Sequence, residues 1–279
     1  MIFAIDNYGT SSNSQPLYLH ASLNELDHTS HLFNFHANSI FDAFDSIKPN
    51  CVITSISRVG KDLLLYLQEC EHKPKLILNI DNTERQQVEQ FLQFLKHSSV
   101  PVEMLITSDY DLDNKLVGVR VLKMPKAADI NQISSLDFNF NINTAFIVDA
   151  PPEQNSIHDT SSFHVISTDE KLTGKVDYVI NCLGLRSLFP KYNQIVFIHS
   201  KDTDQAFFDA IHSGSKVYYK NPSEKLKSKI NKILGIDVDL DYDSDSKLQD
   251  FQEIKNIVDK KHTGYNRTKT MLSQIKGVQ

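Results

Sequence analysis

The sequence lacks the short motifs of several large enzyme classes. It contains no H-E-x-x-H, no C-x-x-C, no G-x-S-x-G and no G-x-x-x-x-G-K-[ST]. H-E-x-x-H supplies a zinc site with its general base, and C-x-x-C supplies a paired-thiol or zinc site. G-x-S-x-G supplies a serine nucleophile, and G-x-x-x-x-G-K-[ST] forms a phosphate-binding loop. A metalloprotease, a zinc finger, a serine hydrolase and a P-loop kinase are therefore not indicated.

Cysteine, positive charge and long apolar runs are scarce as well. The 279 residues include three cysteines, a scattered and odd-numbered set that fits a reducing compartment without a disulfide framework. The net charge is −6 and no dense Lys/Arg stripe is visible, so a nucleic-acid partner is not indicated. No run approaches the roughly 18 apolar residues of a membrane span, and Met1 leads into an apolar segment without the basic region of a signal peptide. We therefore expect a soluble, cytoplasmic protein with no transmembrane segment.

The sequence does contain a regular alternation of strand-like and helix-like segments. Strands are predicted where apolar and β-branched residues run together, at 2–6, 32–36, 51–57, 75–81, 103–108, 119–124, 145–149, 164–167, 177–181, 194–199 and 216–219. Helices are predicted between them, at 16–26, 39–47, 61–71, 83–96, 203–213, 223–234, 248–259 and 265–276. This alternation is typical of an α/β protein with parallel, doubly wound sheets.

The alternation breaks once, near the middle of the chain. Residues 127–143 have little periodicity and include an Asn-rich run, and strand-like segments restart at Ala145. A chain of this length can form two medium-sized domains, each with its own core. We therefore predict two Rossmann-like domains, 1–140 and 141–279, with the last helix crossing back to the first domain.

One βαβ unit in the second half carries the clearest local signals. Residues 194–199 form a strand, Thr203 can cap the following helix, and Gly214 stands where that helix ends. The strand pattern resumes at 216–219, so the two strands are expected to run parallel. The loop 200–204 then lies at the carboxyl edge of the sheet, where open α/β sheets bind ligands.

The same unit resembles part of a known enzyme family. Residues 208–214, Phe-Asp-Ala-Ile-His-Ser-Gly, are similar to the F-E-A-x-A-x-G helix of GT-B glycosyltransferases, and more narrowly to the group-1 C-terminal domain of CgeB-like enzymes. A last helix that opens H-T-Y-x-x-R is common in those domains, and residues 262–267 read His-Thr-Gly-Tyr-Asn-Arg. The sequence departs from the family at Asp209, where glutamate is usual, and at Gly264, an additional residue. The resemblance covers roughly the last third of the chain and implies two α/β domains that face across a cleft.

The resemblance also implies a nucleotide-sugar donor site in the second domain. The family's acidic residue in this helix binds donor hydroxyls, a role that falls here to Asp209, and His212 would contact the donor phosphate. The loop before the helix suits a diphosphate, because the helix dipole and free N–H groups favour an anion. The donor-binding residues expected are Ser200, Lys201, Thr203, Asp209, His212 and Gly214. In the simpler interpretation, Asp209 and His212 are surface residues and Gly214 is a helix cap.

Polar residues at strand ends in the first half are the candidates for the acceptor side. Asp6, His36 and Asp81 follow predicted strands at one sheet edge and are the candidate catalytic bases. The other acceptor-side residues expected are Asn7, Tyr8, Gly9 and Arg58. Each of these residues can also be an ordinary polar loop residue.

Two acidic stretches offer alternative sites. Asp109, Asp111 and Asp113 form overlapping D-x-D motifs, which in GT-A glycosyltransferases hold Mn²⁺ or Mg²⁺ at the donor diphosphate. Residues 239–250 have the aspartate spacing of a calcium-binding EF-hand loop but lack its glycine at the sixth place and end in Asp250. A polar turn and an acidic surface loop are the simpler interpretations, so no metal site is predicted.

These features lead to one functional prediction with two alternatives. We predict a metal-independent GT-B glycosyltransferase that moves a sugar from a nucleotide-activated donor to a hydroxyl of an unknown glycan or other acceptor. No cofactor is expected, since the nucleotide sugar is a substrate. The first alternative is a non-catalytic module that binds a nucleotide sugar or another ligand on the same scaffold. The second is a GT-A enzyme that uses Asp109, Asp111 and Asp113.

Overall fold

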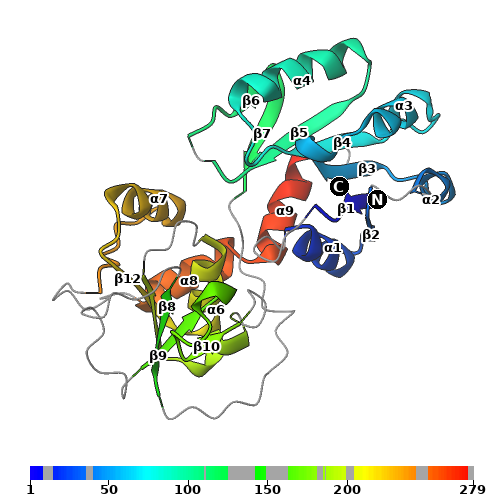
Figure 1. Cartoon of the computed structure of the whole chain (residues 1–279). Helices are drawn as coiled ribbons and strands as arrows, with labels where there is room; N and C mark the ends of the chain where they lie inside the picture. The colour runs from blue at the N-terminus through cyan, green and yellow to red at the C-terminus, as the bar shows by residue number, and fades with distance from the viewer. Residues whose placement is uncertain are drawn as a thin grey trace. The chain divides into compact units, whose positions relative to one another are not determined.

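The computed structural model describes residues 1–8, 15–35, 40–109, 111–124, 142–148, 163–180, 185, 187–198, 204–242 and 251–275. The chain divides into two compact units, each with its own sheet (Figure 1). Unit 1 holds residues 1–10, 14–125 and 264–279, and unit 2 holds residues 11–13 and 126–263. The predicted domain boundary near residue 140 lies outside the described residues and stays a prediction.

The sheet of unit 1 is parallel except at one edge, with the strand order β2-β1-β3-β4-β5-β7-β6. Its strands are β1 (Ile2–Asp6), β2 (Thr29–Phe33), β3 (Cys51–Ser55), β4 (Lys75–Asn79), β5 (Val102–Thr107), β6 (Lys115–Leu116) and β7 (Val119–Lys123). β6 and β7 pair antiparallel through a two-residue turn, Val117-Gly118, in which both residues have positive φ. The central strands β1, β3 and β4 are buried along nearly their whole length, as expected when helices cover both faces of a parallel sheet.

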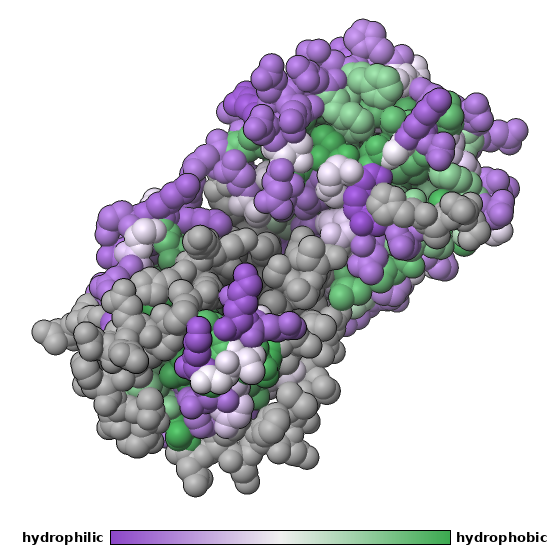
Figure 2. Space-filling model, viewed as in Figure 1, coloured by the Kyte–Doolittle hydropathy of each residue, from purple (hydrophilic) through white to green (hydrophobic). Residues whose placement is uncertain are grey.

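Four helices of unit 1 follow its strands: α1 (Gln15–Glu25), α2 (Ile40–Ile47), α3 (Lys61–Glu69) and α4 (Arg85–His97). Each buries one line of apolar side chains, represented by Leu19, Phe44, Leu67 and Leu92. Apolar residues at helical spacing fall on one face of a helix, which is why these four sequences pack against a core. Figure 2 shows hydrophilic residues over much of the described surface of this unit, with a hydrophobic patch beside α4.

The sheet of unit 2 is entirely parallel among its described strands, in the order β10-β9-β8-β11-β12. Its strands are β8 (Thr144–Val148), β9 (His164–Ser167), β10 (Tyr178–Val179), β11 (Gln194–Ile198) and β12 (Lys216–Lys220). Helix α6 (Asp204–Ser213) connects β11 to β12, which pair in parallel from Gln194 with Lys216 to Ile198 with Lys220. The predicted βαβ unit is therefore confirmed.

Two further helices of unit 2 lie later in the chain, α7 (Glu224–Leu234) and α8 (Phe251–Lys261). α7 begins at an N-cap, because the hydroxyl of Ser223 accepts the backbone N–H of Leu226 at 3.2 Å. It ends at Gly235, whose φ of 73° is a conformation that glycine adopts without strain. α8 packs against α6.

The last helix, α9 (Gly264–Gln274), packs against α1 in unit 1 (Figure 1). Since α8 ends at Lys261, the chain passes from unit 2 to unit 1 within two residues. A Cβ atom at Gly264 would lie only 2.9 Å from Cβ of Tyr18. The additional glycine of the tail motif is thus the residue that allows α9 to approach α1.

The predicted α/β fold class with two Rossmann-like domains is confirmed, but one local prediction is wrong. The strand predicted at 32–36 is β2, which lies at Thr29–Phe33, because pairing with β1 sets the register of this edge strand. Tyr265, the residue after Gly264 in α9, is 40% exposed. Among the described residues, no helix is both long enough and apolar enough to cross a membrane.

Candidate functional site

Buried polar residues of unit 1 gather at the carboxyl edge of its sheet. They end neighbouring strands or begin α1, and they are Asp6, Gln15, Thr54, Ser55, Asn79 and Thr107. β1 leads to β2 on one side and has β3 on its other side, so the crevice between β1 and β3 is the topological switch point of the sheet. Because open α/β sheets bind ligands at such a point, this edge is the candidate site of unit 1.

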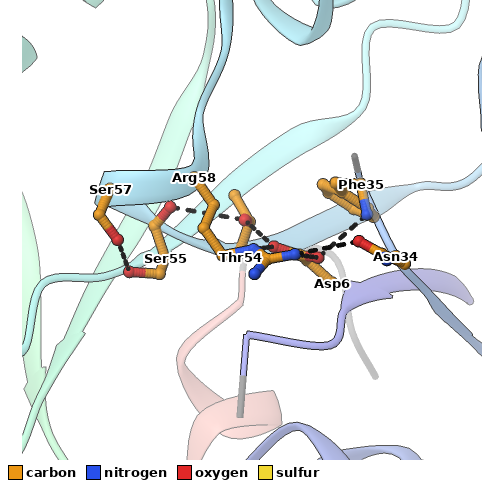
Figure 3. Close-up of polar contacts among 7 residues, drawn as sticks. All are labelled: Asp6, Asn34, Phe35, Thr54, Ser55, Ser57 and Arg58. Carbon is orange, nitrogen blue, oxygen red and sulfur yellow. Dashed lines mark hydrogen bonds and ion pairs between the residues drawn. The ribbon is translucent and has the colours of Figure 1, made fainter. Parts of the chain in front are cut away.

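Asp6, the last residue of β1, is fully buried and forms an ion pair with Arg58 (Figure 3). Nε of Arg58 donates to Oδ2 of Asp6 at 2.8 Å, and Nη2 donates to Oδ1 at 3.3 Å. The backbone N–H of Phe35 donates to Oδ1 at 3.2 Å, and the hydroxyl of Thr54 donates to Oδ2 at 2.9 Å. Each carboxylate oxygen thus accepts two hydrogen bonds, which compensate for removing the charge from water.

Arg58 is oriented by the same contacts. It lies on a short 3₁₀ helix, Ile56–Arg58, that directly follows β3, and its Nη2 also donates to Oδ1 of Asn34 at 3.1 Å. The hydroxyl groups of Ser55 and Ser57 lie 3.0 Å apart in the same loop (Figure 3). The side chain of Arg58 is 26% exposed, so one part of the guanidinium is fixed by a buried acid while another part reaches solvent.

A second polar network lies at the ends of β4 and β5. Nδ2 of Asn79 donates to Oε1 of Gln15 at 2.7 Å and to Oδ2 of Asp81 at 3.3 Å. Oδ1 of Asp81 accepts the hydroxyl of Thr107 at 3.1 Å, and the backbone N–H and hydroxyl of Ser108 at 2.7 and 3.0 Å. Oδ1 is therefore fully engaged, whereas Oδ2 accepts a single long hydrogen bond.

Tyr8 joins this network as a hydrogen-bond donor. Its hydroxyl donates to Oε1 of Gln15 at 2.7 Å. Loss of solvent raises the pKa of Tyr8 well above its ordinary value, and the nearby Tyr18, Asp81 and Asp6 add to this effect. The phenol therefore stays protonated near neutral pH and keeps its hydrogen bond to Gln15.

The structure brings part of the predicted acceptor-side set together. Asp6 and Arg58 form one network, and Tyr8 and Asp81 belong to the other. Asn7 is exposed, and its backbone N–H donates to the carbonyl of Phe33 at 2.7 Å. Two further predicted residues, Gly9 and His36, lie outside the described residues.

Sequence reasoning missed the residues that hold these networks together. They are Gln15, Thr54, Asn79, Thr107 and Ser108. The signal was present, because Thr54, Asn79 and Thr107 are polar side chains at the ends of otherwise apolar, buried strands. In a parallel sheet such residues share the carboxyl edge.

Of the predicted donor-binding residues of unit 2, the structure describes Asp209, His212 and Gly214. Ser200, Lys201 and Thr203 lie outside the described residues. α6 starts at Asp204, shortly after the carboxyl end of β11, and returns the chain to the amino end of β12. Gly214 follows the last turn of α6, so it is separated from the first residue of the helix, Asp204, by about 15 Å of helix.

Asp209 is buried in the middle of α6, contrary to the simpler interpretation of it as a surface residue. α6 is covered on more than one side, because it packs against β12, against α8 and against the short helix Phe189–Lys191. A helix enclosed in this way has almost no solvated face, which the apolar periodicity alone does not reveal. Asp209 has an interaction partner within the protein and is fully buried, so it is not a solvated helix residue.

His212 pairs with α8 rather than with an open loop. Its Nδ1 forms a short contact with Oδ1 of Asp259, and Nζ of Lys255 donates to Oδ2 of Asp259 at 2.5 Å. Partial burial acts to raise the pKa of Asp259, but the hydrogen bonds from Lys255 and His212 outweigh it and lower that pKa below its ordinary value. The described role of His212 is therefore to link α6 to α8.

Gly214 borders a cavity of about 380 Å³ at the amino edge of the sheet. The cavity is lined by Asn143, Thr144, Asn193, Gln194, Gly214, Lys216 and Phe251. Gly214 has a φ of 103° and ends α6, in agreement with the simpler interpretation of a helix cap.

The acidic stretches show no metal-binding arrangement in the described residues. Oδ2 of Asp113 pairs with Arg85 at 3.0 Å, and Oδ1 of Asp109 accepts the backbone N–H of Asp111 at 2.9 Å. Across the described part of the chain, no three His, Cys, Asp or Glu side chains gather as a metal site would require. Most of the 239–250 stretch, from residue 243 onward, lies outside the described residues.

Comparison with known proteins identifies the fold. No family model matches the chain, and neither does any curated protein. Among solved structures, the glycosyltransferase SsfS6 of Streptomyces sp. SF2575 aligns over 97% of this chain and 99% of its own, with a TM-score of 0.56 at 9% identity. The glycosyltransferase SnogD of Streptomyces nogalater aligns over 98% of both chains, with a TM-score of 0.51 at 10% identity. The fold is the GT-B fold.

A third structure widens the set of GT-B neighbours. An alpha-glucosyltransferase in complex with UDP and a 13-mer DNA aligns over 98% of this chain and 95% of its own, with a TM-score of 0.52 at 6% identity. The GT-B fold accounts for both Rossmann-like domains, while the narrower likeness to CgeB-like enzymes stays a prediction. A GT-B scaffold also removes the structural basis for the GT-A alternative.

Proposed function

We propose that this protein is a glycosyltransferase that moves a sugar from a nucleotide-activated donor to an acceptor hydroxyl. The observation that carries the proposal is the GT-B fold, which extends over both units and matches known glycosyltransferases along 97 to 98% of the chain. Fold alone does not determine function, so the proposal also needs a polar site at a sheet edge where a substrate can bind. Unit 1 has such a site at the carboxyl ends of β1, β3, β4 and β5.

The donor is proposed to bind at the carboxyl edge of the second sheet. The loop after β11 carries Ser200, Lys201 and Thr203, and the N-terminus of α6 follows it. Lysine and free backbone N–H groups stabilise the negative charge that develops on a leaving diphosphate. Asp209, His212 and Gly214 are left out of this donor site, because the first is buried, the second pairs with α8 and the third lies at the opposite edge.

The acceptor is proposed to bind at the carboxyl edge of the first sheet, with Asp81 as general base. An acceptor hydroxyl attacks the anomeric carbon of the donor sugar, the bond from that carbon to the diphosphate oxygen breaks, and the hydroxyl proton passes to the base. Oδ2 of Asp81 has room for that proton, since it accepts a single hydrogen bond of 3.3 Å. Asp6 is the weaker candidate base, because both of its oxygens already accept two hydrogen bonds.

A thermal-shift screen against UDP-, GDP-, CMP- and dTDP-sugars tests the donor proposal, because a ligand that binds only the folded state raises the melting temperature. For the best donor, Lys201→Ala should weaken binding roughly tenfold to a hundredfold, as expected for a lost hydrogen bond to a charged group. Lys216→Ala is the matched control, since Lys216 is exposed at the amino edge of the same sheet and should leave binding unchanged. The proposal would be contradicted if both variants lost donor affinity equally, or if none of the nucleotide sugars raised the melting temperature.

The chemistry is proposed to proceed without a tightly bound metal ion. Donor hydrolysis or transfer should then persist in EDTA, since Lys201 and the N–H groups of the loop supply the charge stabilisation. Loss of activity in EDTA with recovery in Mn²⁺ would instead assign a metal to the reaction.

A second candidate function is binding of a nucleotide sugar without transfer. It is favoured by one observation, the complete engagement of Asp6, which leaves Asp81 as the remaining candidate base among the described residues. Nucleotide release separates the two functions: a donor that stabilises the protein but is never cleaved, with or without an acceptor, identifies a binding module. Asp81→Asn should abolish release in a transferase while leaving donor binding intact.

A further inference from the structure

Arg58 carries more hydrogen-bond donors than its fixed partners use. Nε and Nη2 donate to Asp6 and Asn34, whereas no described residue accepts a hydrogen bond from Nη1. A guanidinium has five N–H donors in one plane, so the two on Nη1 remain available to a ligand at the outer edge. With 26% of its side chain exposed, Arg58 presents this edge to solvent at the switch point between β1 and β3.

Asp6 holds that edge in one direction. The carboxylate is fully buried and is itself fixed by the backbone of Phe35 and the hydroxyl of Thr54 (Figure 3). The two donations from Arg58 to Asp6 form a charge-assisted, two-point contact, which specifies orientation as well as distance. An arginine ordered in this way loses less side-chain entropy when a ligand arrives, so its contact contributes more to affinity.

The chemistry around Arg58 selects the class of ligand. Its only acidic partner in the described part of the chain is Asp6, whose charge is already shared among four donors. The two N–H groups on Nη1 of a charged guanidinium favour an oxygen of a carboxylate or a phosphate over a neutral hydroxyl, because hydrogen bonds between charged groups are the stronger ones.

On the basis of the proposed transferase function, we propose that Arg58 recognises an acceptor that carries an anionic oxygen group, either a carboxylate or a phosphate. Asp6 is the residue that positions Arg58. Arg58 binds this group through Nη1 while Asp81 receives the proton of the attacking hydroxyl. Specificity for acidic acceptors thus resides in unit 1 and is separate from donor binding in unit 2.

Matched acceptors test the inference in the full-length protein. The donor is the one identified by the thermal screen. Sugar transfer to glucose, the neutral acceptor, is compared with transfer to glucuronate and to glucose 6-phosphate. In a second set, transfer to benzyl alcohol is compared with transfer to 4-(hydroxymethyl)benzoate. The parent should prefer one acidic member, and the preferred member tells carboxylate from phosphate. Arg58→Lys keeps the charge but loses the planar fork, and should raise KM for the acidic acceptor roughly tenfold to a hundredfold with little change in kcat.

The variants are chosen so that a loss of stability is not mistaken for a loss of acceptor recognition. Arg58→Gln alone leaves the buried carboxylate of Asp6 without its counter-ion, so the double variant D6N/R58Q, which removes both charges, is compared with it. Arg85→Gln is the control, because Arg85 is another ion-paired arginine of unit 1, with Glu89 and Asp113 as its partners. The control should retain the preference for the acidic acceptor, and D6N/R58Q should lose it. The positioning role of Asp6 predicts that Asp6→Asn also raises KM for the acidic acceptor, while KM for the neutral acceptor stays the same.

A binding measurement separates this inference from the proposed function. Inorganic phosphate and benzoate are titrated into the ¹⁵N-arginine-labelled protein, and the Nε–H resonance of Arg58, assigned by its loss in Arg58→Lys, should shift with one of the two. If no donor is cleaved but this resonance still titrates, the transferase proposal fails and anion recognition stands. If donor is cleaved while the resonance does not move, or if Arg58→Lys keeps the full acidic preference, the inference is overturned.

Discussion

Helix α1 in unit 1 and helix α6 in unit 2 are each covered by one of the last two helices of the chain. α9 covers α1 in unit 1, and α8 covers α6 in unit 2. The α1–α9 contact depends on shape, since Gly264 lies directly against the ring of Tyr18. The α6–α8 contact includes charge, since His212, Asp259 and Lys255 meet at its border. A closely packed contact is destabilised by even one added methyl group, whereas half-exposed ion pairs contribute little to the free energy of unfolding. Substitutions in the two contacts should therefore change stability by very different amounts.

The largest effect should come from the apolar interior of α6. Ile211 is fully buried, so Ile211→Ala should lower the free energy of unfolding by about 2–5 kcal/mol through lost burial and the cavity that remains. Ile211→Val removes a single methylene group and should cost only about 0.5–1.5 kcal/mol. Urea denaturation of both variants provides the measurement, and equal, small losses would show that α6 is not enclosed.

Asp209 should come next, although it is charged. Asp209→Ala removes a fully buried carboxylate and leaves its interaction partner without compensation, which should cost about 3 kcal/mol. Asp209→Asn keeps the size and part of the hydrogen bonding and should cost clearly less. If Asp209→Ala unfolds at the same urea concentration as the parent, the Asp209 side chain is not buried as described.

Gly264→Ala tests the shape of the α1–α9 contact. In an open helix position this change would stabilise the protein, because alanine favours the helix by about 1 kcal/mol over glycine. At Gly264 the added Cβ would lie 2.9 Å from Cβ of Tyr18, so we expect a loss of about 1–3 kcal/mol instead. Gly60→Ala is the control, since nothing lies within 4 Å of a Cβ at that position. A stabilised Gly264→Ala variant would mean that α9 does not pack closely on α1.

The smallest effect should come from the charged border of the α6–α8 contact. Asp259 is 34% exposed, so Asp259→Asn should cost less than about 1 kcal/mol near neutral pH. The pKa of Asp259 is lower in the folded state than its ordinary value, so its stabilising contribution is present above that ordinary value and disappears as pH falls through the lowered pKa. Melting temperatures of parent and variant should therefore converge in acid. A difference that grows as the pH falls would contradict this.

The secondary structure and fold class were accessible from the sequence. Apolar runs such as those of β3 and β11 predict buried parallel strands, and the helices between them show helical periodicity. Both signals act over a few residues, so they are readable without tertiary information. β2 shows the limit: its register follows from pairing with β1, and its own composition places the strand three residues too late.

The candidate site was only partly accessible. Asp6, Arg58, Tyr8 and Asp81 were found because they follow predicted strands, and parallel topology brings strand ends to one edge. The pairing of Asp6 with Arg58 spans 52 residues, and no local pattern reports it. Because that pairing engages both carboxylate oxygens, it makes Asp6 a poor candidate for the base.

The sequence by itself determined which segments are strands and helices, and that two parallel sheets follow one another, because propensity and hydrophobic periodicity are short-range properties of the chain. The tertiary structure decided two other matters: that Asp209 in α6 is fully buried, and that Arg58 is fixed by Asp6. Both depend on contacts between residues distant in sequence. Burial and charge pairing are set by the neighbours that folding brings together, and those neighbours exist only once the sheets and helices have packed.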